Sequence, residues 1–90
     1  MSLRSGDLQV KRLTIPDPVA NFIIPETISD TVLKNVGTKD FRFNFTGDFA
    51  THYWTLKIGE TSPVLKVNGG RKIYTDGIGG PTIVEVLMWG

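Results

Sequence analysis

Cysteine is missing from the 90 residues of this sequence, and histidine occurs once. Without cysteine the chain can form neither a disulfide framework nor a thiolate metal site. One histidine and scattered acidic residues give no ligand cluster for another metal. We therefore expect a fold that is held together by packing alone and that uses no metal and no cofactor.

The sequence also lacks an excess of charge and a long apolar run. Its 10 Lys and Arg residues nearly balance its 9 Asp and Glu residues, which leaves a formal net charge of +1. This charge is too small to predict binding to nucleic acid or to an anionic membrane surface. No apolar run approaches the roughly 18–20 residues that span a bilayer, and no signal peptide is visible.

A chain of this length has room for one ordinary core. We expect a single domain over residues 7–90, preceded by a small, polar and disordered tail at residues 1–6. A domain of this size buries only roughly 60–65% of the surface of its unfolded chain. Its margin of stability is therefore expected to be thin.

Residues that favour β-strands dominate the composition. Val, Ile, Thr and the aromatic residues account for 35 of the 90 residues, whereas Ala, Leu, Glu, Gln and Met together account for 15. The first group fits half-buried sheet surfaces and the second fills helices. With 10 Gly and 5 Pro as breaks, the sequence predicts an all-β fold, a small antiparallel β-sandwich or barrel of six to seven short strands.

Alternation of apolar and polar residues marks the individual strands. The clearest case is Phe41, Phe43 and Phe45, which are separated by polar residues and predict a strand with an aromatic core face. The candidate strands lie within residues 8–15, 31–36, 41–45, 52–58, 64–67, 72–75 and 82–89, and residues 19–24 form a further short apolar run.

Two of these segments are irregular. The apolar phase of the first strand slips at Lys11-Arg12, and a β-bulge explains such a slip. Residues 27–36 carry apolar side chains at a spacing of four, which also fits a short helix ending at Gly37. Its β-branched residues favour a strand over residues 31–36.

The last third of the chain predicts a hairpin and a buried strand. Asn68-Gly69 between residues 64–67 and 72–75 supplies the positive φ angles of a tight hairpin turn. Residues 82–89 are apolar on both faces except at Glu85. This strand is therefore expected to be central in its sheet or to be covered by another subunit.

No catalytic constellation is visible. A nucleophilic enzyme needs a nucleophile, a base and an orienting group, but the four serines lie in the tail or at strand breaks. His52 opens a strand beside two aromatic residues, and the aspartates fall at turns or strand ends. Glu85 is explained by pairing with Lys or Arg or by exposure. We therefore predict no catalytic residue and no enzymatic activity.

Aromatic residues provide the candidate binding sites, because they serve at interfaces with a flat apolar face and a polar tip. One hypothesis is symmetric self-association through a sheet edge or an aromatic face. Its candidate contacts are Tyr53, Met88 and Trp89. The other hypothesis is a glycan platform. Its candidate residues are Tyr53, Trp54 and Tyr74, steadied by His52 and Arg71.

The turn spacing carries a resemblance to a known group of proteins. Residues 31–38 (TVLKNVGT) run into residues 41–48 (FRFNFTGD), followed by a short strand, Gly59-Glu60 and an apolar strand. This layout of strand, Asn-x-Gly turn, strand, Gly-Asp turn, strand and Gly-Glu is similar to that of small β-sandwich accessory proteins of tailed bacteriophages. The resemblance covers residues 31–89 and implies a structural or assembly role in a virion, without catalytic residues.

These observations together predict a non-enzymatic structural or assembly protein that acts through protein–protein contacts. The expected partner is a second copy of the chain or another structural protein, and neither nucleic acid nor a membrane is expected. The alternative is a carbohydrate-binding module with a glycan as its partner. The expected location is a virion or the cytoplasm of the producing cell.

Overall fold

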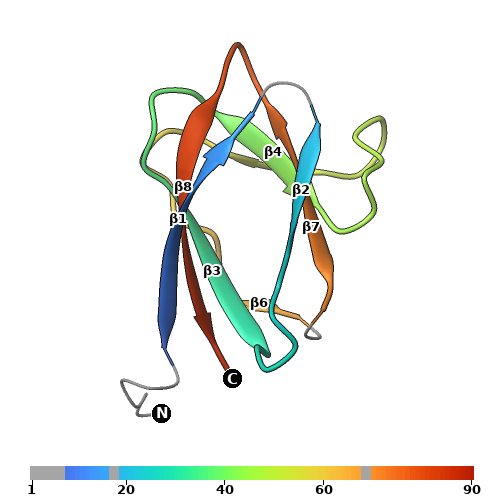
Figure 1. Cartoon of the computed structure of the whole chain (residues 1–90). Helices are drawn as coiled ribbons and strands as arrows, with labels where there is room; N and C mark the ends of the chain where they lie inside the picture. Colours follow the sequence, from blue (N-terminus) through green and yellow to red (C-terminus); the bar gives the residue numbers. More distant parts are fainter. Residues whose placement is uncertain (1–7, 17–18, 68–69) are drawn as a thin grey trace.

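The computed structural model describes residues 8–16, 19–67 and 70–90, which form two β-sheets that face each other (Figure 1). These residues contain eight strands and no helix, and hence no helix that could cross a membrane. The strands are β1 (Gln9–Ile15), β2 (Ala20–Ile23), β3 (Asp30–Asn35), β4 (Phe41–Asn44), β5 (Trp54–Leu56), β6 (Leu65–Lys66), β7 (Lys72–Gly77) and β8 (Thr82–Trp89). The predicted all-β antiparallel sandwich is confirmed, with more strands than expected because several are very short.

Both sheets have four strands and are antiparallel. The first sheet, sheet A, has the order β1-β8-β3-β6, and the second, sheet B, has the order β2-β7-β4-β5. The chain alternates between them, so that only β4 and β5 are both consecutive and paired. One side of the sandwich therefore ends at β1 and β2, and the opposite side ends at β5 and β6.

The predicted hairpin over residues 64–75 is wrong. β6 pairs with β3 in sheet A, whereas β7 pairs with β2 and β4 in sheet B. The two segments separate because each buries its side chains in the core from its own sheet: Val67 follows β6, and Ile73 lies in β7. The Asn68-Gly69 pair that suggested the turn lies outside the described residues.

β8 is central in sheet A, between β1 and β3, as its apolar sequence predicts. Its inward residues are buried, and Glu85 on its outward face meets Arg12 at 2.7 Å between Oε2 and Nη2. The strand over residues 31–36 is also confirmed, because β3 spans Asp30–Asn35. Residues 30–35 therefore pair with β8 as a strand, although the apolar residues at a spacing of four also fitted a short helix.

The bulge predicted at Lys11-Arg12 is wrong. The register of β1 with β8 is continuous from Gln9 opposite Met88 to Ile15 opposite Thr82. The slip in the apolar pattern has another cause, since Val10 lies on the outward face of sheet A and is 61% exposed. An apolar residue on the solvent-facing side interrupts the alternation of apolar and polar residues in the same way that a bulge would.

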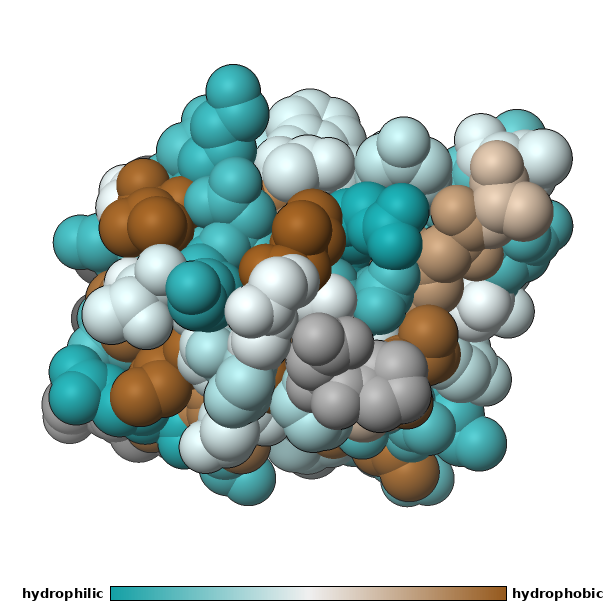
Figure 2. Space-filling view, turned by 90° about the horizontal axis from the view of Figure 1, so that it is seen from above, coloured by the Kyte–Doolittle hydropathy of each residue, from teal (hydrophilic) through white to brown (hydrophobic). Residues whose placement is uncertain are grey.

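The core lies between the sheets. Phe41 and Phe43 of β4 are buried, as the alternation predicts, and Phe45 packs against the core from the end of this strand. The largest fully buried side chains are Phe41, Ile15, Ile24, Leu33, Leu56, Ile73, Val84, Val86, Asn35, Thr31 and Thr75. At the end where β7 turns into β8, apolar residues form separate patches among polar ones (Figure 2).

Candidate functional site

A pocket of about 400 Å³ lies on the β5–β6 side of the sandwich. It is lined by residues of β4, β5 and the loop that joins them, by Leu65 of β6 and by one residue just before β7. The lining residues are Phe43, Asn44, Phe45, Thr46, His52, Tyr53, Trp54, Leu65 and Arg71. The structure therefore brings together four residues that the sequence singles out as binding candidates: His52, Tyr53, Trp54 and Arg71.

Trp54 forms an aromatic wall of this pocket. It pairs with Phe43 across β4 and β5, and the two rings stack with centroids 6.5 Å apart and planes at 25°. Phe43 is buried, whereas Trp54 is 51% exposed. The indole is thus supported by the core on one side and remains accessible at the pocket.

Arg71 supplies the positive charge of the pocket. Its guanidinium carbon lies 4.5 Å from the centroid of the Phe45 ring, in a cation–π contact. The lining residues include no aspartate and no glutamate. The charge of the guanidinium is therefore not neutralised by an acidic side chain of the pocket wall.

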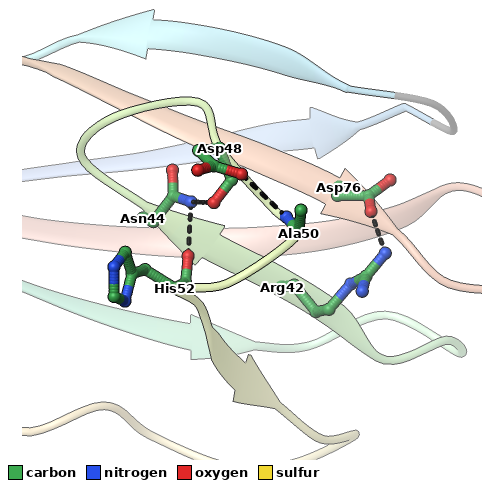
Figure 3. A network of polar contacts seen from close by, with 6 residues as sticks. All are labelled: Arg42, Asn44, Asp48, Ala50, His52 and Asp76. Atoms are coloured by element: carbon green, nitrogen blue, oxygen red, sulfur yellow. Dashed lines mark hydrogen bonds and ion pairs between the residues drawn. The ribbon is translucent and has the colours of Figure 1, made fainter.

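Asn44 shapes the loop over residues 45–53, which contributes several lining residues (Figure 3). Its Nδ2 donates to the carbonyl oxygens of Asp48 at 2.8 Å and His52 at 2.6 Å. Its Oδ1 accepts from the backbone N–H groups of Gly47 at 2.8 Å and Thr46 at 3.3 Å. This one buried side chain thus replaces backbone pairing where β4 ends.

A second anchor holds the same loop on the outward face of sheet B. Arg42 pairs with Asp76 of β7 (Figure 3), and its guanidinium carbon lies 4.9 Å from the ring centroid of Tyr53 and 5.8 Å from that of Phe49. Tyr53 thus turns its ring outward while Trp54 turns inward, as strand alternation predicts.

The remaining predicted contact residues lie away from the pocket lining. Tyr74 pairs with Asn44 across β7 and β4 and is half-buried. Met88 is 2% exposed in the core, and Trp89 is 8% exposed at the end of β8. Self-association through Tyr53, Met88 and Trp89 stays a prediction.

The sequence pattern missed several lining residues. The alternation predicts that Phe43 and Phe45 belong to the core, and no pattern points to Asn44 as a site residue. An asparagine that ends an alternating strand and precedes a glycine by three residues is the available signal for such a turn. Thr46 and Leu65 carry no comparable signal, because only the fold brings β6 to this loop.

The pocket does not fit a metal ion. His52 is the only lining residue with a good metal ligand. In the part of the chain that the structure describes, no three His, Cys, Asp or Glu side chains lie close enough to hold a metal. The inward positions of the neighbouring strands carry Phe41, Phe43 and Leu56, which offer no ligand atoms.

No protein-family model and no curated protein sequence matches this chain, but solved structures do. A cupin-2 domain containing protein from Shewanella frigidimarina NCIMB 400 is similar with a TM-score of 0.62 and 15% identity, over 98% of this chain and 76% of that one. The chain has the cupin fold. The Cupin_2 domain of an XRE family transcriptional regulator from Enterobacter cloacae has a TM-score of 0.57 at 12% identity, over 93% of this chain and 97% of that one.

A further similar structure is that of the Clostridium difficile EutQ protein. Its TM-score is 0.63 at 10% identity, and the match covers 94% of this chain and 58% of that one. This chain thus spans little more than half of the EutQ protein, so that the likeness is to one part of it.

The cupin fold corrects the resemblance to bacteriophage accessory proteins. The similar structures from Shewanella frigidimarina and Enterobacter cloacae are cupin-2 domain proteins, so the predicted role as a structural or assembly protein of a virion is wrong, as is its alternative, a carbohydrate-binding module. The turn spacing over residues 31–89 misled because it reports where short strands end. It does not report which strands pair.

Proposed function

We propose that this protein is a non-catalytic binding module that takes a small organic molecule into the pocket between β5 and β6. The observation that carries the proposal is that three aromatic residues, Phe43, Phe45 and Trp54, and one cation, Arg71, line a single cavity of about 400 Å³. Ligand pockets in proteins typically have volumes of roughly 300–1,000 Å³ and apolar walls with a few polar groups.

The polar groups of the pocket support binding more than catalysis. Nucleophilic and acid–base mechanisms need a base that is oriented by a hydrogen-bonded partner. His52 is the only imidazole, and among the described residues no hydrogen bond reaches its ring. The amide of Asn44 is fully engaged with the loop backbone. The pocket wall thus holds no nucleophile paired with a base.

Tryptophan fluorescence tests this proposal directly. The sequence has two tryptophans, so Trp89→Phe leaves Trp54 as the only reporter, at the pocket. We expect at least one of three ring compounds (benzoate, phenyl phosphate and benzamide) to change its emission with one-to-one saturation, and each compound to remain chemically unchanged by NMR. Absence of saturable binding for all three would overturn the proposal.

A matched pair of variants locates the binding. Trp54→Ala removes the aromatic wall, and Ile58→Ala shortens an apolar side chain of similar exposure outside the pocket lining, at 57% against 51%. By calorimetry, Trp54→Ala should weaken binding about tenfold because a ring contact is lost. Ile58→Ala should change it less than twofold. Equal effects of the two changes would place the ligand elsewhere.

A further inference from the structure

We propose that the ligand of this pocket is a planar organic anion, whose carboxylate or phosphate oxygens bind Arg71 while its ring lies against Trp54. This inference rests on the proposed function and adds the chemical class of the ligand to it.

The charges around the pocket call for an anion. Three basic side chains of the described residues have an acidic partner, in the pairs Arg12–Glu85, Arg42–Asp76 and Lys66–Asp30. Arg71 instead faces the ring of Phe45, and no acidic residue lines its pocket. A ligand that brings negative charge gains an attraction that no lining residue already satisfies.

The geometry of Arg71 suits a bidentate anion. The guanidinium carbon of Arg71 lies over the ring of Phe45, at 4.5 Å from the ring centroid. A cation–π contact uses no N–H hydrogen bond, and the planar fork of a guanidinium can bind two oxygens side by side. Phe45 directly follows Asn44, whose hydrogen bonds to Thr46 and Gly47 fix the chain at this point. The support under Arg71 is therefore rigid before the ligand arrives.

Trp54 favours a flat apolar group in the other part of the ligand. Its indole stacks on the buried ring of Phe43 and is 51% exposed. A planar ring gains most from such a face, because it contacts the indole over its whole area. Arg71 and Trp54 line the same cavity of about 400 Å³, which is of the size that holds a molecule of one or two rings.

The test compares three probes of similar size on the full chain by calorimetry. Benzoate and phenyl phosphate are anions with a planar ring, and benzamide is the neutral counterpart of benzoate. We expect both anions, or one of them, to bind at least tenfold more tightly than benzamide, and the tighter of the two identifies the oxyanion. Arg71→Gln should reduce this preference to less than threefold.

Lys72→Gln is the matched control, because it removes an exposed positive charge next to Arg71 in sequence and outside the pocket lining. It should change the affinity for the anions less than twofold. The inference is overturned if benzamide binds as tightly as the anions, or if Arg71→Gln and Lys72→Gln have the same effect. In either case, binding of benzamide that Trp54→Ala weakens about tenfold would still support the proposed function, whereas absence of all binding would end both.

Discussion

Asn35 and Asn44 end two strands, and each side chain makes four hydrogen bonds, of which three are of the same kind. In each case Nδ2 donates to two carbonyl oxygens, and Oδ1 accepts from a backbone N–H group that follows within three residues. The reach of these bonds differs. Asn35 joins separate strands, because it donates to Leu56 in β5 at 3.0 Å and accepts from the hydroxyl of Thr82 in β8 at 3.1 Å. All partners of Asn44 lie within the next eight residues.

The two asparagines organise different parts of the structure. Asn35 is completely buried and connects sheet A to sheet B. Asn44 is also buried but organises only the loop that carries His52 and leads to Trp54. The same side-chain chemistry thus stabilises the whole sandwich at one place and shapes the pocket at the other.

The largest effect is expected for Asn35→Ala. The variant leaves the carbonyl of Leu56 and the hydroxyl of Thr82 without this partner in a site closed to water. Each unsatisfied buried group costs about 1–3 kcal/mol, so we expect a loss of about 3 kcal/mol or more in the free energy of unfolding. Asn44→Ala should cost about 1 kcal/mol, because its loop partners can reach water. Urea denaturation measures both, and equal losses would contradict the comparison.

Substitution of the glycine that follows Asn35 should also lower stability more than substitution of the glycine that follows Asn44. A Cβ atom at Gly37 would lie 2.0 Å from Thr82 Oγ1 and 2.4 Å from the backbone nitrogen of Ile83. Because that backbone belongs to β8, Gly37→Ala should destabilise by about 2–3 kcal/mol, as overpacking does.

At Gly47 the obstacle is the backbone conformation, with φ at 81°, and a Cβ atom would lie 3.2 Å from the ring of Tyr74. Gly47→Ala should therefore cost about 1–2 kcal/mol, the energy of a left-handed residue. Thermal denaturation followed by circular dichroism ranks the two variants. A lower melting temperature for Gly47→Ala than for Gly37→Ala would reverse the predicted order.

Ligand affinity should depend more on Asn44 than on Asn35, whereas stability should depend more on Asn35. Asn44→Ala releases the loop over residues 45–53, so the pocket has to be ordered when the ligand binds. We expect about tenfold weaker binding of benzoate. Asn35→Ala, measured at a temperature where it remains folded, should bind benzoate within threefold of the unchanged protein. Calorimetry on both variants provides the test, and an unchanged affinity in Asn44→Ala would show that the loop is held by other contacts.

The smallest effect concerns Asp30, at the opposite end of β3 from Asn35. The Lys66 ammonium, at 2.6 Å, and the Ser29 hydroxyl, at 2.9 Å, lower the pKa of Asp30 below its ordinary value of 3.8. A carboxyl whose pKa is lower in the folded chain contributes stability at pH values above about 3.8. This contribution is lost as the pH falls through the lower, folded-state pKa.

Asp30→Asn should therefore lower stability at pH 7 and leave it less dependent on pH below pH 4. The effect is small because the side chain of Lys66 is 83% exposed, where water and salt screen the pair. Urea denaturation at pH 7 and pH 3 measures it. If Asp30→Asn and the unchanged protein lose the same amount of stability from pH 7 to pH 3, the acid sensitivity comes from other groups.

The sequence predicts which face of a strand individual residues of the candidate site occupy. It does not predict which distant residues meet there. Alternation predicts that the neighbouring residues Tyr53 and Trp54 face opposite sides of sheet B. The contacts of Trp54 with Phe43 and of Tyr53 with Arg42 confirm this. The meeting of Arg71 with Phe45 could not be predicted, because the two residues come from separate parts of sheet B. Nor could the order of strands in the sheets, since a run such as β6 carries no information about its partner.

The amino-acid sequence alone predicts that this protein is all-β, that residues 82–89 form a strand that is central or covered by another subunit, and that Phe41 and Phe43 face the core. These properties follow from local alternation and from β-branched and aromatic side chains, which act within a few residues. Only the tertiary structure decided that β6 and β7 belong to different sheets and that a pocket opens beside them. The physical reason is that strand pairing and cavity walls depend on backbone groups and side chains far apart in the chain, which hydrophobic burial brings together.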